Sequence, residues 1–180
     1  MLNWYLQSGN DSDVVLSTRI RTARNIKGFP FVNRYTKKDA LKIIEIVEEA
    51  VNSLGYGLKV IKLKDLDLSL IKEGVYVFFQ TNWDQYFEDE EKYNNHPEIS
   101  IEVIKYLVDK NVNMIGIDTL GLGVSKNHGI IDKYLGDHKM YAIENLCNLK
   151  NIPNKNFKVY CLPMKIEGLD GYPARILVEF

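Results

Sequence analysis

The chain has 180 residues and a formal net charge of −1, from 23 basic and 24 acidic side chains. A hydrophobic fraction of 46% supports one ordinary core or two small modules, which excludes a disordered chain. The balanced charge excludes a strongly basic nucleic-acid-binding protein and gives no attraction to an anionic membrane.

Cysteine usage and targeting patterns indicate the cytoplasm. Cys147 and Cys161 have no CxxC spacing and lie in apolar surroundings, so we expect free thiols in a reducing compartment. No apolar run approaches the roughly 18 residues that a membrane span needs, and the first residues lack a secretory signal pattern. We therefore expect a cytoplasmic protein without a membrane or nucleic-acid partner.

The first third of the chain is expected to form a strand, a helix and a second strand. Residues 13–21 alternate as in a strand, and the apolar positions of residues 37–54 recur every three or four residues as in a helix. A capping-box pattern beginning at Thr36 and a stop signal at Gly55 support that helix. A short strand is expected at 58–63.

After a polar stretch at 64–74, strands and helices alternate again. Short apolar or alternating runs predict strands at 74–81, 112–118, 139–146, 157–164 and 174–180. Helices are expected from Ser100 through Asn111 and from His128 to His138. This alternation predicts a mixed fold of the α/β or α+β class.

Three arginines lie close together around the first predicted strand. Ser17, Arg19 and Arg21 share one strand face, and guanidinium groups match phosphate oxygens in a bidentate way. The order of residues in DVVLSTRIRTARNIKGFPF, at 13–31, resembles the opening motif of the phosphagen kinase family, particularly bacterial protein-arginine kinases. This resemblance covers residues 1 to about 72 and implies that these three residues bind nucleotide phosphates. A solvated, salt-bridged edge strand is the alternative.

The remainder of such a kinase is missing. These enzymes need further arginines, a carboxylate base and a guanidino-substrate pocket in a longer downstream domain, and nothing after residue 72 supplies them. Kinase activity and use of ATP are therefore not expected, and the phosphate-binding residues are predicted to be vestigial. The strand at 13–21 must then pair with another sheet edge or remain prone to association.

From about residue 72 onward the chain resembles a second family. The segments IKEGVYVFFQTNWDQYF, HPEIS, NMIGIDTLGLG and LPMKIEGLDGYPARILVEF are similar, in order, to the C-terminal part of the cyclase family, which includes metal-dependent kynurenine formamidases. The resemblance implies part of a swivelling β/β/α domain over residues 73–180, preceded by the kinase-like fragment over residues 1–72. The implied chemistry is hydrolysis of an amide by metal-activated water.

The cyclase resemblance implies roles for individual residues. Glu144 matches a glutamate at the family's metal centre and is predicted to be a metal ligand and catalytic residue, whereas His128 matches a histidine that transfers protons. Without the resemblance, Glu144 reads as a turn carboxylate and His128 as the first residue of a surface helix. Trp83 is predicted to line a substrate pocket, although a core or interface cluster explains its aromatic neighbours equally well. His96 is expected to be a turn or helix-entry residue and not a ligand, and the role of Asp118 is left open.

The family's metal-binding signature, HxGTHxDxP, does not occur in the sequence. A catalytic zinc needs three protein ligands and an open position, which Glu144 and His128 alone do not supply. We therefore predict an incomplete relative of the kynurenine formamidases. If active, it would bind Zn or Mn, hydrolyse a small linear amide and complete its site as a homo-oligomer. The alternatives are a catalytically silent remnant, a binding or structural protein with a vestigial phosphate-binding segment, and a recombined chimera.

Overall fold

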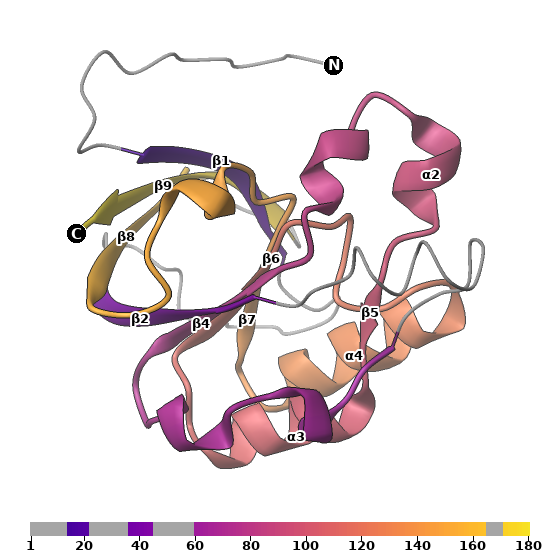
Figure 1. Ribbon diagram of the computed structural model, residues 1–180. Coiled ribbons are helices and arrows are strands. Elements are labelled where there is room, and N and C mark those ends of the chain that lie inside the picture. The colour runs from indigo at the N-terminus through magenta and orange to yellow at the C-terminus, as the bar shows by residue number, and fades with distance from the viewer. Residues whose placement is uncertain (1–13, 22–35, 45–59, 165–170) are drawn as a thin grey trace.

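Seven strands of the chain close into a barrel (Figure 1). The structure, a computed structural model, describes residues 14–21, 36–44, 60–164 and 171–180. The barrel strands, in their spatial order, are β1 (Val14–Arg21), β7 (Tyr141–Glu144), β6 (Met114–Ile117), β4 (Tyr76–Gln80), β2 (Thr36–Ile44), β8 (Phe157–Pro163) and β9 (Gly171–Glu179). The predicted mixed α/β class is therefore confirmed.

The remaining elements lie outside the barrel sheet. Strands β3 (Val60–Ile61) and β5 (Glu98–Ile99) form a separate parallel pair. The α-helices are α2 (Glu90–Asn94), α3 (Ile101–Asp109) and α4 (Lys126–Asp137). Short 3-10 turns are η1 (Leu63–Asp65), η2 (Leu68–Leu70), η3 (Trp83–Tyr86) and η4 (Leu149–Asn151). None of the helices in the described ranges has the length and apolar character needed to cross a membrane.

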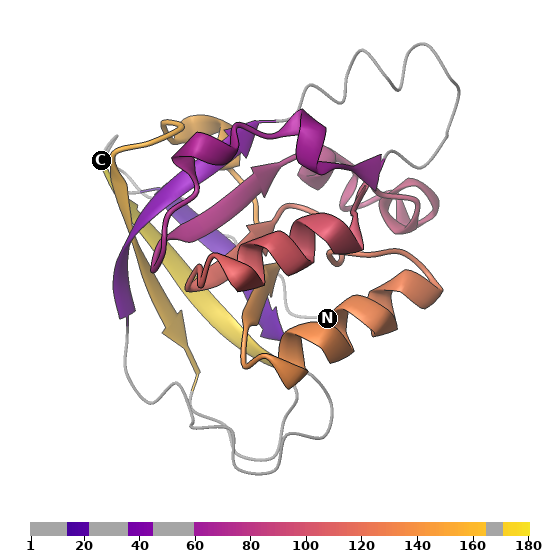
Figure 2. The same cartoon turned by 90° about the horizontal axis from the view of Figure 1, so that it is seen from below.

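The barrel combines a parallel half with an antiparallel half. Strands β2, β4, β6 and β7 are parallel neighbours, whereas β1 pairs antiparallel with β7 and β9, and β8 pairs antiparallel with β2 and β9. Parallel neighbours need crossover connections, which here contain α3 and α4. These two helices lie side by side against the parallel half of the sheet (Figure 2).

The parallel strands are buried on both faces, which explains their continuous apolar sequences. In β4, Tyr76 and Phe78 belong to the cluster of side chains inside the barrel, while Val77 and Phe79 pack with the side chains of α3 and α4. The strands predicted at 74–81, 112–118, 139–146, 157–164 and 174–180 are confirmed with slightly different ends. The helix expected from Ser100 is also confirmed, and the Ser100 side chain accepts a hydrogen bond from the Val103 backbone N–H.

The helix predicted at 37–54 is wrong over its first part. Residues 36–44 form strand β2, which lies between β4 and β8. Ala40 packs inside the barrel and Leu41 packs on the helix-covered side, so both apolar residues are buried because the strand alternates between two covered faces. Pairing with two neighbouring strands thus overrides a local helical periodicity. The rest of that prediction, at 45–54, lies outside the described residues.

The first predicted strand finds partners on both sides. Val14 is in register with Val178 of β9, and Arg19 is in register with Glu144 of β7. Strand β1 therefore closes the barrel and is not an exposed edge. The barrel takes strands from both sides of residue 72, and the division of the chain at that residue stays a prediction.

Candidate metal centre

The carboxyl ends of the parallel strands β4, β6 and β7 meet at one end of the barrel. Thr81 follows β4, Asp118 follows β6, and Glu144 is the last residue of β7. The Asn145 backbone N–H donates to the Thr119 carbonyl at 2.8 Å, which ties the segments after β7 and β6 together. Polar side chains that follow these strands are therefore gathered in one place.

Three side chains that can bind a cation converge beside this end of the sheet. One ligand atom each from His128, Asp132 and Glu144 lies within 4.8 Å of the others. Glu144 is buried on the same face of β7 as Ala142, which packs against the helices, and the other two residues are half-buried on α4. His128 Nε2 lies 3.3 Å from Asp132 Oδ2 because residues four apart share one face of a helix.

Gly121 leaves the space in which His128 and Glu144 approach each other. A Cβ atom on Gly121 would lie 2.5 Å from Nδ1 and 2.6 Å from Cε1 of the His128 ring, and 3.3 Å from Glu144 Oε1. The imidazole therefore rests directly on the Gly121 backbone, with the Glu144 carboxylate beside it. Any larger residue at this position would have to move the ring.

The His128 ring has an oxygen acceptor beside each of its two nitrogen atoms. Its Nδ1 lies 3.3 Å from the Gly123 carbonyl oxygen, which can only accept a hydrogen bond. Nε2 lies 3.3 Å from Asp132 Oδ2, which is also an acceptor, so each ring nitrogen lies beside an oxygen atom. A backbone carbonyl in contact with one ring nitrogen is a common feature around metal-binding histidines.

Asp118 holds the end of β4 against the end of β6. Its carboxylate accepts hydrogen bonds from the backbone N–H of Thr81 at 2.8 Å, from the Thr81 hydroxyl at 2.7 Å and from the backbone N–H of Asn82 at 2.8 Å. Only 1% of Asp118 is exposed, and this burial raises its pKa to about 7 despite the donors that favour the carboxylate. Asp118, whose role the sequence left open, thus has a structural role: it connects the residues after β4 to the end of β6.

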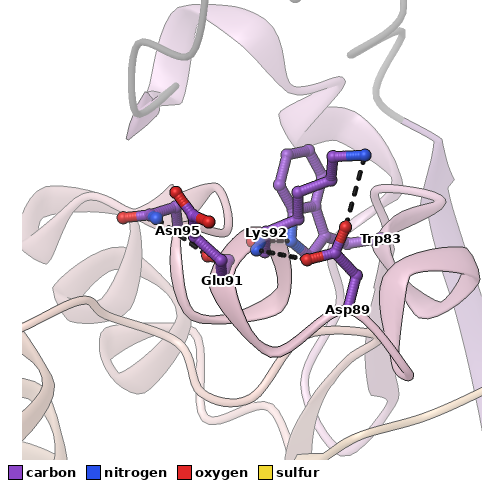
Figure 3. A network of polar contacts seen from close by, with 5 residues as sticks. All are labelled: Trp83, Asp89, Glu91, Lys92 and Asn95. Atoms are coloured by element: carbon purple, nitrogen blue, oxygen red, sulfur yellow. Dashed lines mark hydrogen bonds and ion pairs between the residues drawn. The ribbon is translucent and has the colours of Figure 1, made fainter.

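Trp83 packs with Tyr86 and Tyr93 in an aromatic lobe formed by η3 and α2. Figure 3 shows Trp83 beside the residues around α2. The Trp83 indole N–H donates to the Lys92 carbonyl at 3.1 Å, and the ring packs edge-on against Tyr86 at a centroid distance of 5.0 Å. Trp83 is buried within this lobe, and its part in a substrate pocket stays a prediction. Tyr93 of this lobe donates its hydroxyl to Asn145 Oδ1 at 2.7 Å, and Asn145 is the residue after Glu144.

The predicted phosphate-binding residues lie on β1, beside β7. Arg19 is opposite Glu144, Arg21 is opposite Ala142, and Ser17 is opposite Arg175 of β9. This register places the kinase-like motif next to the strand that carries the candidate ligand Glu144. Phosphate binding by these residues stays a prediction.

Sequence reasoning missed Asp132 of the cluster and Gly121 beside it, and it described His96 incompletely. Asp132 follows His128 by four positions in a helix that the sequence predicts, so this spacing was an available signal. Gly121 had no such signal, because its contacts with His128 and Glu144 arise only in the folded chain. His96, expected to be a turn residue, is buried, with Nδ1 at 2.7 Å from the Pro97 carbonyl oxygen. Burial lowers the pKa of His96 and thus favours its neutral form.

Comparison with solved structures defines the fold as that of cyclase-type hydrolases. Isatin hydrolase A from Ralstonia solanacearum superposes with a TM-score of 0.75 at 18% identity, covering 89% of this chain and 70% of that chain. A structure described as a potential metal-dependent hydrolase with cyclase activity has a TM-score of 0.62 at 22% identity, covering 91% of this chain and 78% of that one. At these identities the comparison establishes the fold alone.

Sequence comparison confirms both predicted resemblances. The family described as "Putative cyclase" matches residues 39–124, so the cyclase-like stretch extends before residue 72. A protein from Methanocaldococcus jannaschii is 29% identical over 118 residues, which cover 65% of this chain and 60% of that protein. The protein-arginine kinase of Clostridium novyi (strain NT) is 47% identical over 51 residues, which cover 28% of this chain. That match spans 15% of the kinase's length.

Proposed function

We propose that the chain is a metal-dependent hydrolase of a small linear amide, with a divalent cation held by His128, Asp132 and Glu144. The observation that carries this proposal is the approach of three ligand atoms to within 4.8 Å of one another. The sequence signature that supplies most ligands in the kynurenine formamidases is absent, but Asp132 adds the third ligand that Glu144 and His128 lacked.

The residues present fit a zinc or manganese ion. One imidazole nitrogen and two carboxylates form a mixed nitrogen and oxygen donor set, which suits both metals. The position of Gly121 favours the same conclusion, because the missing side chain leaves the His128 ring and the Glu144 carboxylate in mutual reach. Three protein ligands also leave a position open for water or substrate, as catalytic zinc sites require.

Each of the three ligand residues would have its own role at the site. The cation would act as a Lewis acid and lower the pKa of a bound water molecule. Glu144 offers its carboxylate from a buried strand end, where a charged ligand interacts strongly with a cation. Asp132 offers a second carboxylate from α4, and His128 offers an imidazole nitrogen from the same helix. If His128 instead only transfers protons, its replacement would leave metal affinity intact.

The substrate class is inferred from the fold and the sequence resemblance together. The solved relatives carry the names isatin hydrolase and metal-dependent hydrolase, and both describe hydrolytic enzymes. We propose an aryl formamide or a similar linear amide, with the aromatic lobe around Trp83 beside the reacting end. We further propose that the active form is a homo-oligomer.

A metal-binding experiment with matched variants tests the proposal. The purified chain is titrated with Zn²⁺ and Mn²⁺ by calorimetry and then assayed for hydrolysis of aryl formamides. We expect stoichiometric binding that weakens at least about 10-fold in Asp132→Asn and in Glu144→Gln. Asp137→Asn is the control, because Asp137 lies on the same helix and pairs with Lys133 at 2.6 Å, outside the cluster.

Three outcomes would contradict the proposal. Absence of stoichiometric metal would favour a silent remnant or a structural protein. Full metal affinity in both ligand variants would place the cation elsewhere. Metal binding without hydrolysis of any amide in the panel would favour a binding protein.

A further inference from the structure

Strand β5 lies along the turn that precedes α4. The Ile99 backbone N–H donates to the Leu122 carbonyl at 2.7 Å, which fixes the two segments beside each other. The neighbouring Glu98 carboxylate accepts a hydrogen bond from the Val124 backbone N–H at 3.1 Å. The same carboxylate accepts from Asn127 Nδ2 at 3.0 and 3.2 Å. Glu98 therefore forms hydrogen bonds with the turn on both sides of Ser125, to Val124 and to Asn127.

Ser125 has a backbone conformation that residues other than glycine rarely adopt. Its φ is 51° and its ψ is −125°, at the N-cap position of α4. The Ser125 side chain makes no capping hydrogen bond, so the usual benefit of serine at this position is missing. A strained residue of this kind persists only where its surroundings hold it in place.

The turn also packs closely against the start of α4. A Cβ atom on Gly123 would lie 2.9 Å from the Asn127 carbonyl carbon and 2.9 Å from the His128 nitrogen. The Asn127 N–H closes the turn by donating to the Val124 carbonyl at 3.0 Å. The path of the turn thus determines where the first residues of α4 lie, and His128 is among them.

We propose that Glu98 is a positioning residue of the candidate metal centre. It holds the strained turn at Ser125 and thereby keeps the His128 ring against Gly121, next to Glu144. The part that concerns metal binding rests on the proposed function; the part that concerns the placement of His128 does not.

The effect of losing Glu98 should be local. Ile131 and Leu135 anchor the middle of α4 in the core, with 2% and 3% of their surface exposed. Without the Glu98 carboxylate, Ser125 can relax toward an ordinary backbone conformation, and the first turn of α4 moves with it. His128 lies in that turn, so its ring position should change while the rest of the helix stays packed.

The experiment uses the full chain with Glu98→Ala, Ser125→Gly and the double variant. Zn²⁺ affinity is measured by competition with a chromophoric chelator, and the His128 ring is followed by NMR in the metal-free protein. We expect Glu98→Ala to weaken Zn²⁺ binding about 10-fold and to shift the His128 ring signals. Ser125→Gly in the Glu98→Ala background should restore most of the Zn²⁺ affinity and return the His128 ring signals toward their wild-type positions. The reason is that glycine adopts this conformation without strain. Asn127→Ala, which removes one partner of Glu98, tests the same link if Glu98→Ala does not fold.

Glu73→Ala is the matched control, because Glu73 accepts a hydrogen bond from the Asn111 amide at 2.7 Å and belongs to another part of the chain. The proposal is overturned if Glu98→Ala and Asn127→Ala leave the His128 signals unchanged in the metal-free protein. It is also overturned if the double variant recovers neither the Zn²⁺ affinity nor the His128 signals of the wild type. If the wild type binds no Zn²⁺, the proposed function fails, but the NMR comparison still decides whether Glu98 positions His128.

Discussion

Replacing Gly121 by alanine is the sharpest test of the candidate metal centre. Its Cβ would enter the space between the His128 ring and the Glu144 carboxylate, at 2.5 Å from His128 Nδ1. An ordinary van der Waals contact begins at 3.4 Å, so the ring must retreat by about 0.9 Å. The carboxylate, at 3.3 Å, needs almost no movement. The change therefore acts mainly on the imidazole.

A ring displacement of this size should strongly lower the affinity for a metal ion. Disturbing the groups that orient metal ligands typically lowers affinity by about 10- to 100-fold. We expect Gly121→Ala to weaken Zn²⁺ binding within that range. The loss of hydrolysis should be at least as large, since a misplacement of about 1 Å can reduce a rate by about 100-fold.

The assay compares two glycine-to-alanine variants of the same chain. A Cβ atom on Gly129, in α4, would meet no atom within 4 Å. Gly129→Ala should leave Zn²⁺ affinity unchanged and stabilise the helix by about 0.5–1 kcal/mol. Circular dichroism checks that both variants fold. If Gly121→Ala binds Zn²⁺ as tightly as Gly129→Ala does, His128 is not a ligand at the observed position.

Three further changes probe the barrel. Gly116→Ala should destabilise the chain by about 1–3 kcal/mol in urea unfolding, because its Cβ would lie 2.6 Å from Phe78 and 2.8 Å from Leu146; an unchanged midpoint would contradict the packing inside the barrel. Asp118 binds its proton more tightly in the folded chain, with a pKa of about 7 against an ordinary 3.8. Its contribution to stability is thus largest below about pH 4 and is lost as the pH rises to about 7. The stability advantage of the wild type over Asp118→Asn should shrink across that range, and parallel profiles would refute this. Lys42 is buried and its Nζ donates to the Leu149 carbonyl at 2.6 Å and the Ile152 carbonyl at 2.5 Å. Lys42→Met should cost about 1–3 kcal/mol, whereas the exposed Lys158→Met on β8 should cost little.

Most elements after residue 74 were predictable because their patterns agree with their surroundings. The apolar run ending at Gln80 is a strand covered on both faces, and the helix after Ser100 has a cap and one buried side. Strand β2 was not predictable, because its residues repeat with a helical period and become a strand only between β4 and β8. Local periodicity carries no information about those neighbours.

The candidate site was predictable only in part. Glu144 and His128 were found through a family resemblance, and the structure brings both into one cluster with Asp132. The spacing of His128 and Asp132 on a helix would have suggested the third ligand. Gly121 and Glu98 could not be found in this way, because their contacts with the site depend on segments that meet only after folding.

The closure of the barrel by β1 has a consequence for how the chain folds. Strand β1 precedes the other barrel strands in the chain, but its partners β7 and β9 lie far along the sequence, so that Val14 pairs with Val178. Such distant pairings carry a high loop-closure entropy and slow the step that forms them. We expect β2, β4 and β6 to associate with α3 first, and the pairing of β1 with β7 and β9 to form last. Because Glu144 lies on β7, which pairs with β1, completion of the metal centre would be coupled to the final step of folding.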